Sequence, residues 1–263
     1  MLLEDAKVLQ QREIQGGYRL LVLAAPLMAP KVQPGQFVHL RVPHLDSAVL
    51  RRPFSVYKAD GGTLSILYKD VGRGTSAMKA LRDGETVSLL GPLGHGFPAP
   101  AKDKVPVLVA GGYGMAALYL VAKTSAVKGV VFVGGRSAQD VLCVPEFTAL
   151  GWTVHVSTDD GSLGVKGLVT DALEPWLHKE LKGRTPEFFA CGPNGMLKAV
   201  GERAIRGNWT AWLSVDRKMG CGVGACLTCV QKIATPDGGW TWERVCKEGP
   251  VFESRQIVWK DET

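Results

Sequence analysis

Four cysteines near the C-terminus are the residues of this sequence whose spacing most clearly specifies chemistry. Cys221, Cys226 and Cys229 share one short glycine-rich segment, and Cys246 follows after sixteen residues. This C-x4-C-x2-C…C order is the ligand spacing of plant-type [2Fe-2S] ferredoxins. Glycines allow the positive φ angles and the close backbone approach that wrapping a cluster requires. The sequence therefore predicts a [2Fe-2S] site with these four thiolates as ligands, in a protein that passes electrons.

Zinc is the alternative interpretation of the same cysteines. Structural zinc sites usually combine two short C-x2-4-C knuckles, and here only Cys226 and Cys229 form one. Cys221 and Cys246 would have to supply an irregular second pair. A disulfide framework is less favoured, because the chain is long and shows no export signal.

Two segments in the first third of the chain carry groups that suit a flavin. Arg51-Arg-Pro-Phe-Ser55 places cationic, aromatic and hydroxyl side chains at the start of an expected strand. These side chains could meet a pyrophosphate, an isoalloxazine ring and a hydrogen-bonding ring atom. In Tyr68-Lys-Asp-Val-Gly-Arg-Gly-Thr75, Gly74 and Thr75 open a short expected helix, whose N-terminus could face a phosphate. An ordinary strand with a capped turn remains the alternative for the first segment.

Three glycine-bearing loops follow buried strands in the second half of the chain. They are Ala110-Gly-Gly-Tyr-Gly-Met115, Gly134-Gly-Arg136 and Cys191-Gly-Pro193. Open α/β sheets bind ligands at the carboxyl ends of their strands, so the three loops together predict a nucleotide crevice. The first loop does not have G-x-G-x-x-G spacing, and glycine in a tight turn is the alternative. Cys191 is expected at the mouth of this crevice, whereas Cys143 is expected in the core.

Short strands divided by turns are expected over the first 98 or so residues, which predicts a small antiparallel barrel. One short helix, about Thr75–Leu81, interrupts them. The sequence pattern predicts strands at Tyr18–Ala24, Gln36–Val42, Phe54–Tyr57, Thr63–Lys69 and Thr86–Leu90.

After residue 104 apolar strands alternate with helices, which predicts parallel βαβ units. A hairpin is expected at the end of the chain, with its turn at Pro236–Gly239, and it should bring Cys246 back to the cysteine loop. The expected strands of the α/β part are Val105–Ala110, Val130–Val133, Thr153–Ser157, Glu187–Ala190 and Ala211–Val215, and the expected helices are Met115–Lys123, Val169–Leu181 and Met196–Ile205.

Composition narrows the class of protein. The chain has 263 residues, of which 46% are hydrophobic and 21% charged, as in soluble globular proteins. No apolar run approaches the roughly 20 residues of a membrane span. The N-terminus lacks the basic start and apolar core of a secretory signal, so a cytoplasmic protein is expected. The net charge of +6 comes from scattered Lys and Arg, which suits anionic cofactors or an acidic partner better than nucleic acid.

The order of these segments resembles the ferredoxin–NADP reductase superfamily with a C-terminal [2Fe-2S] domain. More narrowly, it is similar to the electron-transfer subunits of NAD-linked (class 1B) dihydroorotate dehydrogenases. The resemblance covers nearly the whole chain, and its most specific parts are the cysteine loop and VCKEGPVF. The other matching segments are RRPFSV, YKDVGRGT, GPLGHGF, AGGYGMAAL, TDDGSLGVKGLVTD and CGPNGML.

The resemblance implies three units: a flavin-binding barrel at residues 1–98, an NAD-binding α/β domain at 99–213 and a cluster domain at 214–263. It implies FAD, NAD(H) and a [2Fe-2S] cluster as cofactors. The positions that match the FAD site are Arg52, Pro53, Phe54, Ser55, Leu67, Tyr68, Lys69, Gly74 and Thr75. Those that match the NAD(H) site are Gly111, Gly112, Gly134 and Cys191.

The resemblance also implies a partner, an FMN-containing (β/α)8 subunit that oxidises dihydroorotate, in a heterotetramer of two plus two subunits. Electrons would pass from FMN through the cluster and FAD to NAD+. Related subunits serve sulfhydrogenases and NADH–ferredoxin oxidoreductases, which is the alternative function; a zinc-stabilised interaction module is the alternative of another class. The chain departs from the superfamily pattern at Phe54, where Tyr is common, and at Tyr113 and Ala117 in the first glycine loop.

Overall fold

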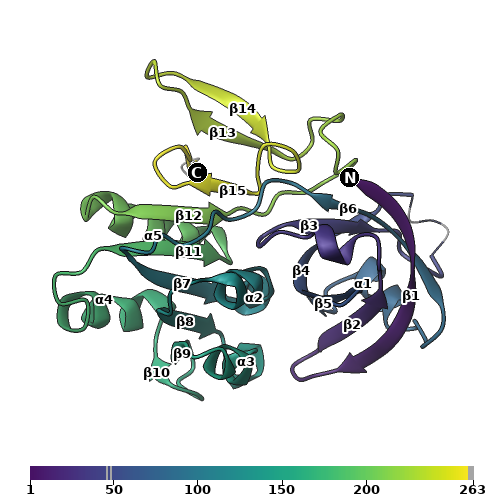
Figure 1. The fold of residues 1–263 in the computed structure, drawn as a ribbon, viewed down its shortest axis with the longest axis horizontal. Helices are drawn as coiled ribbons and strands as arrows, with labels where there is room; N and C mark the ends of the chain where they lie inside the picture. The colour runs from purple at the N-terminus through teal and green to yellow at the C-terminus, as the bar shows by residue number, and fades with distance from the viewer. Residues whose placement is uncertain (46, 48, 260–263) are drawn as a thin grey trace.

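The computed structural model describes residues 1–45, 47 and 49–259, and it has a barrel beside an open sheet (Figure 1). The closed barrel has the strand order β1-β2-β5-β4-β3-β6, with every neighbouring pair antiparallel. This confirms the expected antiparallel barrel. Its strands are β1 (Leu2–Glu13), β2 (Tyr18–Ala24), β3 (Phe37–Leu40), β4 (Arg52–Asp60), β5 (Thr63–Lys69) and β6 (Thr86–Leu93).

The second sheet has seven strands in the order β10-β9-β8-β7-β11-β12-β15, and the pairs from β10 to β12 are parallel. Its central strand is apolar and buried almost throughout, because helices cover both faces of the sheet. The expected α/β fold is therefore confirmed. The strands are β7 (Val105–Gly111), β8 (Val130–Gly135), β9 (Thr153–Thr158), β10 (Val165–Lys166), β11 (Pro186–Cys191), β12 (Thr210–Ser214) and β15 (Val251–Glu253).

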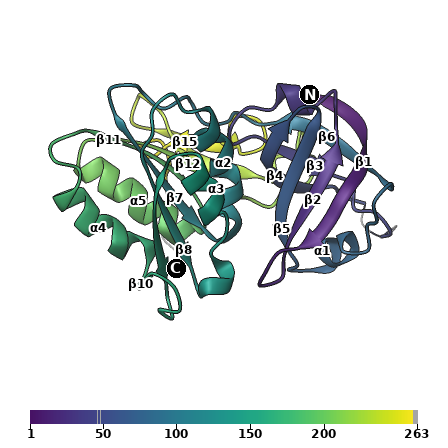
Figure 2. The ribbon, with the colours of Figure 1, turned by 60° about the horizontal axis from the view of Figure 1, so that its bottom comes forward.

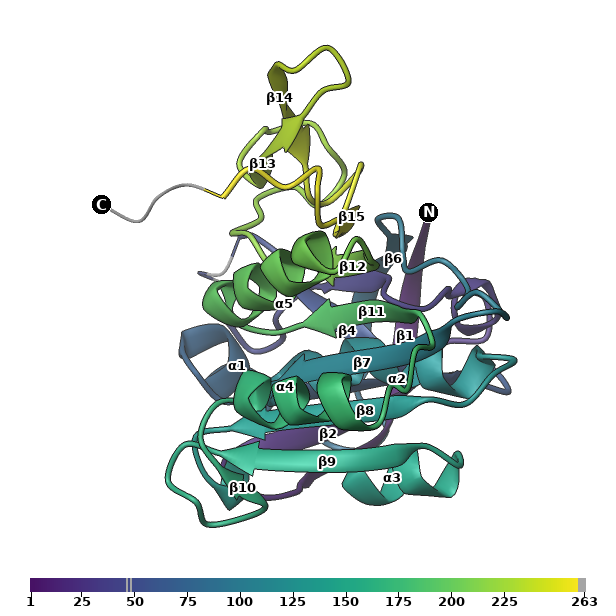
Figure 3. The ribbon, with the colours of Figure 1, turned by 90° about the vertical axis from the view of Figure 1, so that its left-hand side faces the viewer.

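The helices divide between the two faces of this sheet, as Figures 2 and 3 show. Helices α4 (Val169–Lys179) and α5 (Asn194–Arg206) cover the face that is turned away from the barrel. Helices α2 (Met115–Thr124) and α3 (Val144–Ala149) lie on the other face, between sheet and barrel. The short α1 (Arg73–Met78) belongs to the barrel. Among the described residues, no helix has the length and apolar character needed to cross a membrane.

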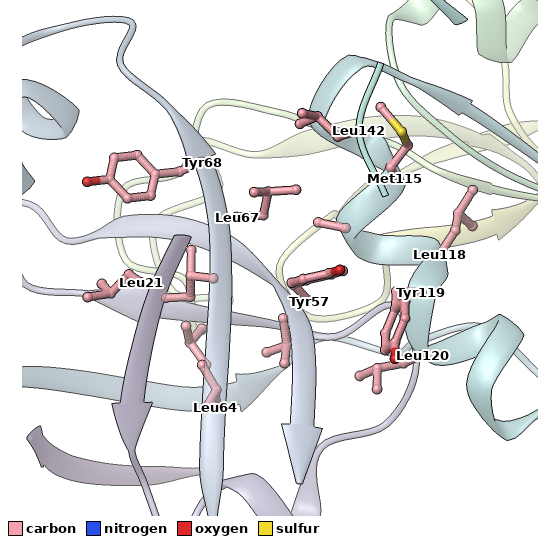
Figure 4. Close-up of a cluster of buried hydrophobic side chains, with 14 of the residues drawn as sticks. Leu21, Tyr57, Leu64, Leu67, Tyr68, Met115, Leu118, Tyr119, Leu120 and Leu142 are labelled. Carbon is pink, nitrogen blue, oxygen red and sulfur yellow. The ribbon is translucent and has the colours of Figure 1, made fainter. Parts of the chain in front are cut away.

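Barrel and sheet share one hydrophobic core along α2 (Figure 4). The ring of Tyr57 on β4 faces that of Tyr119 on α2, with centroids 5.0 Å apart. Leu67 of the barrel and Met115 of α2 belong to the same buried cluster. This continuous packing keeps two surfaces close together. One is the barrel surface with the segments predicted to bind a flavin, and the other is the sheet with the three glycine loops.

The tail of the chain forms a hairpin, β13 (Val230–Ala234) and β14 (Trp240–Arg244), which projects from the rest of the molecule. The chain then returns to the sheet, where β15 pairs antiparallel with β12. The cysteine loop lies between β12 and β13, so it is anchored at one side by the sheet and at the other by the hairpin.

The first strand, β1, is an element that the sequence pattern did not predict. Its inward positions include Glu4, Ala6 and Val8, all buried, and the first of these breaks the apolar alternation. The Glu4 carboxylate accepts the backbone N–H groups of Leu27 and Met28, at 3.0 and 2.8 Å. An inward carboxylate is tolerated here because its oxygens are satisfied, and a pattern of apolar residues cannot reveal that.

Candidate cofactor sites

The four cysteines form two pairs of neighbouring thiols. The backbone N–H of Cys221 lies 3.4 Å from Sγ of Cys226. Cys229 and Cys246 are both buried and interact through their side chains. The hairpin makes this second pair, because the N–H of Val245 donates to the carbonyl of Cys229 at 2.8 Å. A [2Fe-2S] cluster takes two protein ligands on each iron, so two thiol pairs are the donor set it requires.

Backbone N–H groups of the loop point at the sulfur atoms. Those of Val223 and Ala225 lie 3.4 and 3.3 Å from Sγ of Cys221. The loop therefore offers paired thiols with N–H groups around them, which fits a two-iron cluster with hydrogen-bonded sulfur ligands.

The thiols differ in acidity. Hydrogen bonds, first of all from the Thr228 hydroxyl, lower the pKa of Cys226 to about 6. Burial and the neighbouring Cys229 raise the pKa of Cys246 to about 12. Iron binding requires the thiolate form, so metal uptake at Cys246 must release its proton.

The loop glycines have the backbone that the cluster interpretation requires. Gly222 and Gly224 have φ angles of +72° and +85°. Gly220 is different: a Cβ there would lie 3.1 Å from Sγ of Cys226, so close approach to sulfur explains this glycine. Arg244, which the sequence analysis did not single out, braces the loop by donating to the Gly224 carbonyl at 3.0 Å and pairing with Glu248.

The predicted FAD positions come together on one side of the barrel. Arg52, Pro53, Phe54 and Ser55 lie on β4, and Leu67, Tyr68 and Lys69 lie on the neighbouring β5. The rings of Phe54 and Tyr68 meet edge to face, with centroids 5.9 Å apart. Leu67 and Tyr68 are buried in the core, so they could meet a flavin chiefly through their backbone.

The expected phosphate end of the FAD site also assembles. A Cβ at Gly74 of α1 would lie 3.4 Å from Nε of Arg52, so the two predicted phosphate contacts are neighbours. The Thr75 hydroxyl accepts the backbone N–H groups of Val71 and Gly72, at 2.9 and 3.1 Å. Thr75 thus shapes the turn that leads into α1, and Arg52 supplies the positive charge beside it.

The predicted NAD(H) positions lie together at the carboxyl edge of the sheet. Gly111 pairs with Gly134 across β7 and β8, and Ala110 pairs with Cys191 across β7 and β11. A Cβ at Gly111 would lie 2.7 Å from Cδ of Pro193, and one at Gly134 would lie 2.8 Å from Cβ of Val169. These glycines therefore permit close packing of loops and helix, while Gly112, with φ of +55°, makes the turn.

Two cysteines outside the loop are kept protonated by their surroundings. Burial raises the pKa of Cys191, at the end of β11, to about 12. Burial likewise raises the pKa of Cys143 to about 12, and this residue packs against the core at the start of α3. Neither thiol is activated as a nucleophile.

The chain was compared with known proteins. It is 41% identical to the dihydroorotate dehydrogenase B (NAD(+)), electron transfer subunit of Geobacillus kaustophilus, over 97% of this chain and 98% of that protein. The protein of the same name from Desulforamulus reducens is 36% identical, with the same coverage. This chain belongs to that family of electron transfer subunits. Residues 216–258 match the family described as the iron-sulfur cluster binding domain of dihydroorotate dehydrogenase B, and they contain all four loop cysteines.

Solved structures agree on the fold of these electron transfer subunits. A chain from a structure of NADH-dependent reduced ferredoxin-NADP oxidoreductase superposes with a TM-score of 0.83, at 26% identity, over 97% of this chain and 90% of that one. Phthalate dioxygenase reductase gives a TM-score of 0.62 at 17% identity, over 93% of this chain and 94% of that one. The resemblance of the sequence to the ferredoxin–NADP reductase superfamily is thereby confirmed.

Proposed function

We propose that this chain is the electron-transfer subunit of a dihydroorotate dehydrogenase and passes electrons from an FMN-containing partner to NAD+ in pyrimidine biosynthesis. The proposed route uses a [2Fe-2S] cluster bound by Cys221, Cys226, Cys229 and Cys246, and an FAD held on β4, β5 and α1. The observation that carries the proposal is the position of the cysteine loop. Gly222 of that loop lies against His39 of β3, and the strand partner of His39 is Pro53 in the predicted FAD segment.

The layout of the chain suits the conversion between one-electron transfer at the cluster and two-electron transfer at the nicotinamide. A nicotinamide exchanges two electrons as hydride and a cluster exchanges one, and a bound flavin supplies the chemistry that links them. In this chain the expected flavin strand β4 pairs with β3, whose His39 meets the cysteine loop, and the expected flavin strand β5 ends at Lys69, which pairs with Asp140 of the α/β part. Arg52 would fix the pyrophosphate, and the loops at Gly111, Gly134 and Cys191 would fix the nucleotide.

The partner is proposed from the name of the relatives. We infer an FMN-containing (β/α)8 subunit that oxidises dihydroorotate, joined to this chain in a heterotetramer of two plus two subunits, in the cytoplasm. Support comes from the cysteine loop, whose outer thiol, Cys226, is exposed. A cluster at the surface can exchange electrons with a docked protein, whereas a buried structural site could not.

The test is to purify the chain anaerobically, alone and together with an FMN-containing dihydroorotate-oxidising subunit from the same organism. The proposal expects about two irons and one FAD per chain, an EPR signal of a reduced [2Fe-2S] centre, and dihydroorotate:NAD+ activity only in the complex. NADH should reduce the FAD of the isolated chain. Stoichiometric zinc without flavin would contradict the cofactors, and NADH–ferredoxin or hydrogenase activity without dihydroorotate oxidation would contradict the partner.

A further inference from the structure

His39 is a fully buried polar side chain with no visible partner. Its exposed fraction is 0%, and neither Nδ1 nor Nε2 has a hydrogen-bond partner among the described residues. Buried polar groups in native proteins are nearly always hydrogen-bonded, because desolvation without compensation costs folding free energy. The chain has placed an imidazole where the protein alone leaves it unsatisfied, which indicates a partner that is not part of the polypeptide.

The ring of His39 points out of the barrel and toward the cysteine loop. On β3, Val38 and Leu40 belong to the core of the barrel, whereas Phe37 belongs to the cluster of buried residues that includes Cys229 and Cys246. His39 alternates with its neighbours and therefore shares the outward face with Phe37. The rings of Phe37 and His39 meet edge to face, with centroids 6.1 Å apart.

The edge of the imidazole that carries Nδ1 meets the loop beside a cysteine. A Cβ added at Gly222 would lie 2.6 Å from Nδ1, 2.8 Å from Cε1 and 2.9 Å from Cγ of His39. Gly222 directly follows Cys221 and has a φ of +72°. Two separate reasons therefore require glycine at position 222: its backbone conformation and the close approach of the His39 ring.

Two arginines, Arg51 and Arg52, are the charged groups that act on the ring of His39. Arg51 uses its guanidinium on the backbone of His39 and Ser88, at 3.4 and 2.7 Å from their carbonyl oxygens. Burial, followed by Arg51 and Arg52, lowers the pKa of His39 to about 4. The ring is thus neutral, with one N–H that requires an acceptor. Sulfur atoms of a cluster carry negative charge and accept hydrogen bonds from nearby donors.

We propose that Nδ1–H of His39 donates a hydrogen bond to a sulfur atom of the [2Fe-2S] cluster at the Cys221 side and thereby raises the reduction potential of the cluster. This inference rests on the proposed function. Reduction adds negative charge to the cluster, so a donor aimed at its sulfur stabilises the reduced form more than the oxidised form. His39 would therefore act on the cluster by direct contact. It also ties the cysteine loop to the strand that pairs with the FAD segment.

The test compares three variants by potentiometric EPR titration of the cluster. Asparagine can place an amide N–H near the position of Nδ1, so His39→Asn should keep the potential close to that of the unmodified protein. His39→Leu removes the donor and should lower the equilibrium constant for one-electron reduction about tenfold, a shift of about 59 mV to lower potential. His39→Gln, whose amide reaches the position of Nε2, should behave like His39→Leu.

A second measurement needs no substitution at the site. Protein labelled with ¹⁵N-histidine, in the reduced state, should show a weak ¹⁵N hyperfine coupling to the cluster by pulsed EPR. His95 is the control, because it is exposed and its Nδ1 lies 2.7 Å from the Lys247 carbonyl oxygen near the same loop. His95→Gln should keep the coupling, and His39→Asn should abolish it.

An unchanged potential in a cluster-loaded His39→Leu variant would overturn the proposal, as would the absence of the ¹⁵N coupling. If His39→Leu loses its cluster, the labelled protein and His39→Asn still decide the matter. Failure of the proposed function would look different, because the unmodified protein would then lack iron and the reduced-state EPR signal altogether.

Discussion

Nζ of Lys69 lies 2.7 Å from Oδ1 of Asp140, and this ion pair joins the barrel to the sheet. Lys69 ends β5, and Asp140 lies in a 3-10 turn (Ala138–Asp140) after β8. The hydroxyl of Tyr18 donates to the same carboxylate oxygen at 2.9 Å, and the Lys69 ammonium lies over the Tyr18 ring. A residue predicted to contact FAD therefore also holds the two cofactor-bearing units together.

Replacing Lys69 should weaken this junction in a pH-dependent way. Burial raises the pKa of Asp140, but the hydrogen bonds from Lys69 and Tyr18 outweigh it, and the net pKa lies below the usual range. A lowered pKa contributes stability above the ordinary Asp pKa of about 3.9, and this contribution is lost as the pH falls through the folded-state value. Lys69→Met should therefore cost about 1–2 kcal/mol in urea unfolding at pH 7, and this cost should shrink progressively as the pH falls below about 4.

Lys79 provides the matched control for that measurement. Its ammonium pairs with Asp70 at 2.9 Å, but the lysine side chain is 46% exposed, against 32% for Lys69. Lys79→Met should cost clearly less than Lys69→Met, because solvent screens exposed ion pairs. Equal losses in both variants would contradict a special role for the Lys69–Asp140 pair.

Arg52 and Arg51 are adjacent in sequence and should have separable effects. Arg52→Ala should weaken FAD binding about 10- to 100-fold by removing a charged hydrogen bond worth roughly 1.5–3 kcal/mol, and apoprotein stability should change little. Arg51 instead donates to the carbonyl and hydroxyl oxygens of Ser88, at 2.7 and 3.0 Å. Arg51→Ala should lower the stability of the barrel. Flavin fluorescence titration and thermal unfolding of the apoproteins separate the two outcomes.

The cluster ligands should be separable from the flavin site. Cys226→Ser should lose the cluster or hold it weakly, because serine oxygen is a harder and poorer donor to iron than thiolate sulfur. FAD should remain bound, since its expected positions lie on the barrel. NADH should then still reduce FAD and dye acceptors, while electron transfer with the partner collapses. Full activity of Cys226→Ser with the partner would show that the cluster is not on the electron path.

Local sequence patterns predicted much of this fold, because apolar patterning and turn residues are sufficient to identify a strand or hairpin where no other effect competes. Strands β2 and β5 have the bounds that apolar patterning and flanking turns indicated, and the hairpin turn places Cys246 as expected. Strand β1 was not predicted, because its inward Glu4 breaks the apolar alternation. The backbone N–H groups that satisfy this carboxylate come from a distant loop. Helix α3, Val144–Ala149, was not predicted because it has only six residues and contains Pro145.

The residues of the candidate sites likewise divide into those that the sequence identifies and those that only the folded structure reveals. Cysteine spacing identified the four predicted cluster ligands, because the number of cysteines and the length of the loop can be counted in the sequence. His39 and Asp140 could not be found there, because their importance comes from contacts made far along the chain. His39 lies in an apolar strand and Gly222 is distant from it in sequence, so only the folded barrel brings them together. The positions proposed to bind FAD and NAD(H), and the boundaries of the three units, stay predictions.

The carboxyl edge of the sheet, where Gly111, Gly134 and Cys191 lie, offers the sharpest test of the nucleotide site. Gly114 is the N-cap residue of α2 and has a φ of −58°, which any residue can adopt, but a Cβ there would lie 2.1 Å from the carbonyl oxygen of Cys191. Gly114→Ala must therefore push α2 away from the Cys191 loop, at a cost of about 1–3 kcal/mol. This shift should raise KM for NADH in FAD reduction while iron content stays unchanged. Gly195 on α5 is the control, because its added Cβ would meet no atom within 4 Å beyond its chain neighbours and the backbone of its own helix. Gly195→Ala should be neutral or stabilise the protein by up to about 1 kcal/mol, and an unchanged KM in Gly114→Ala would place the nucleotide away from this edge.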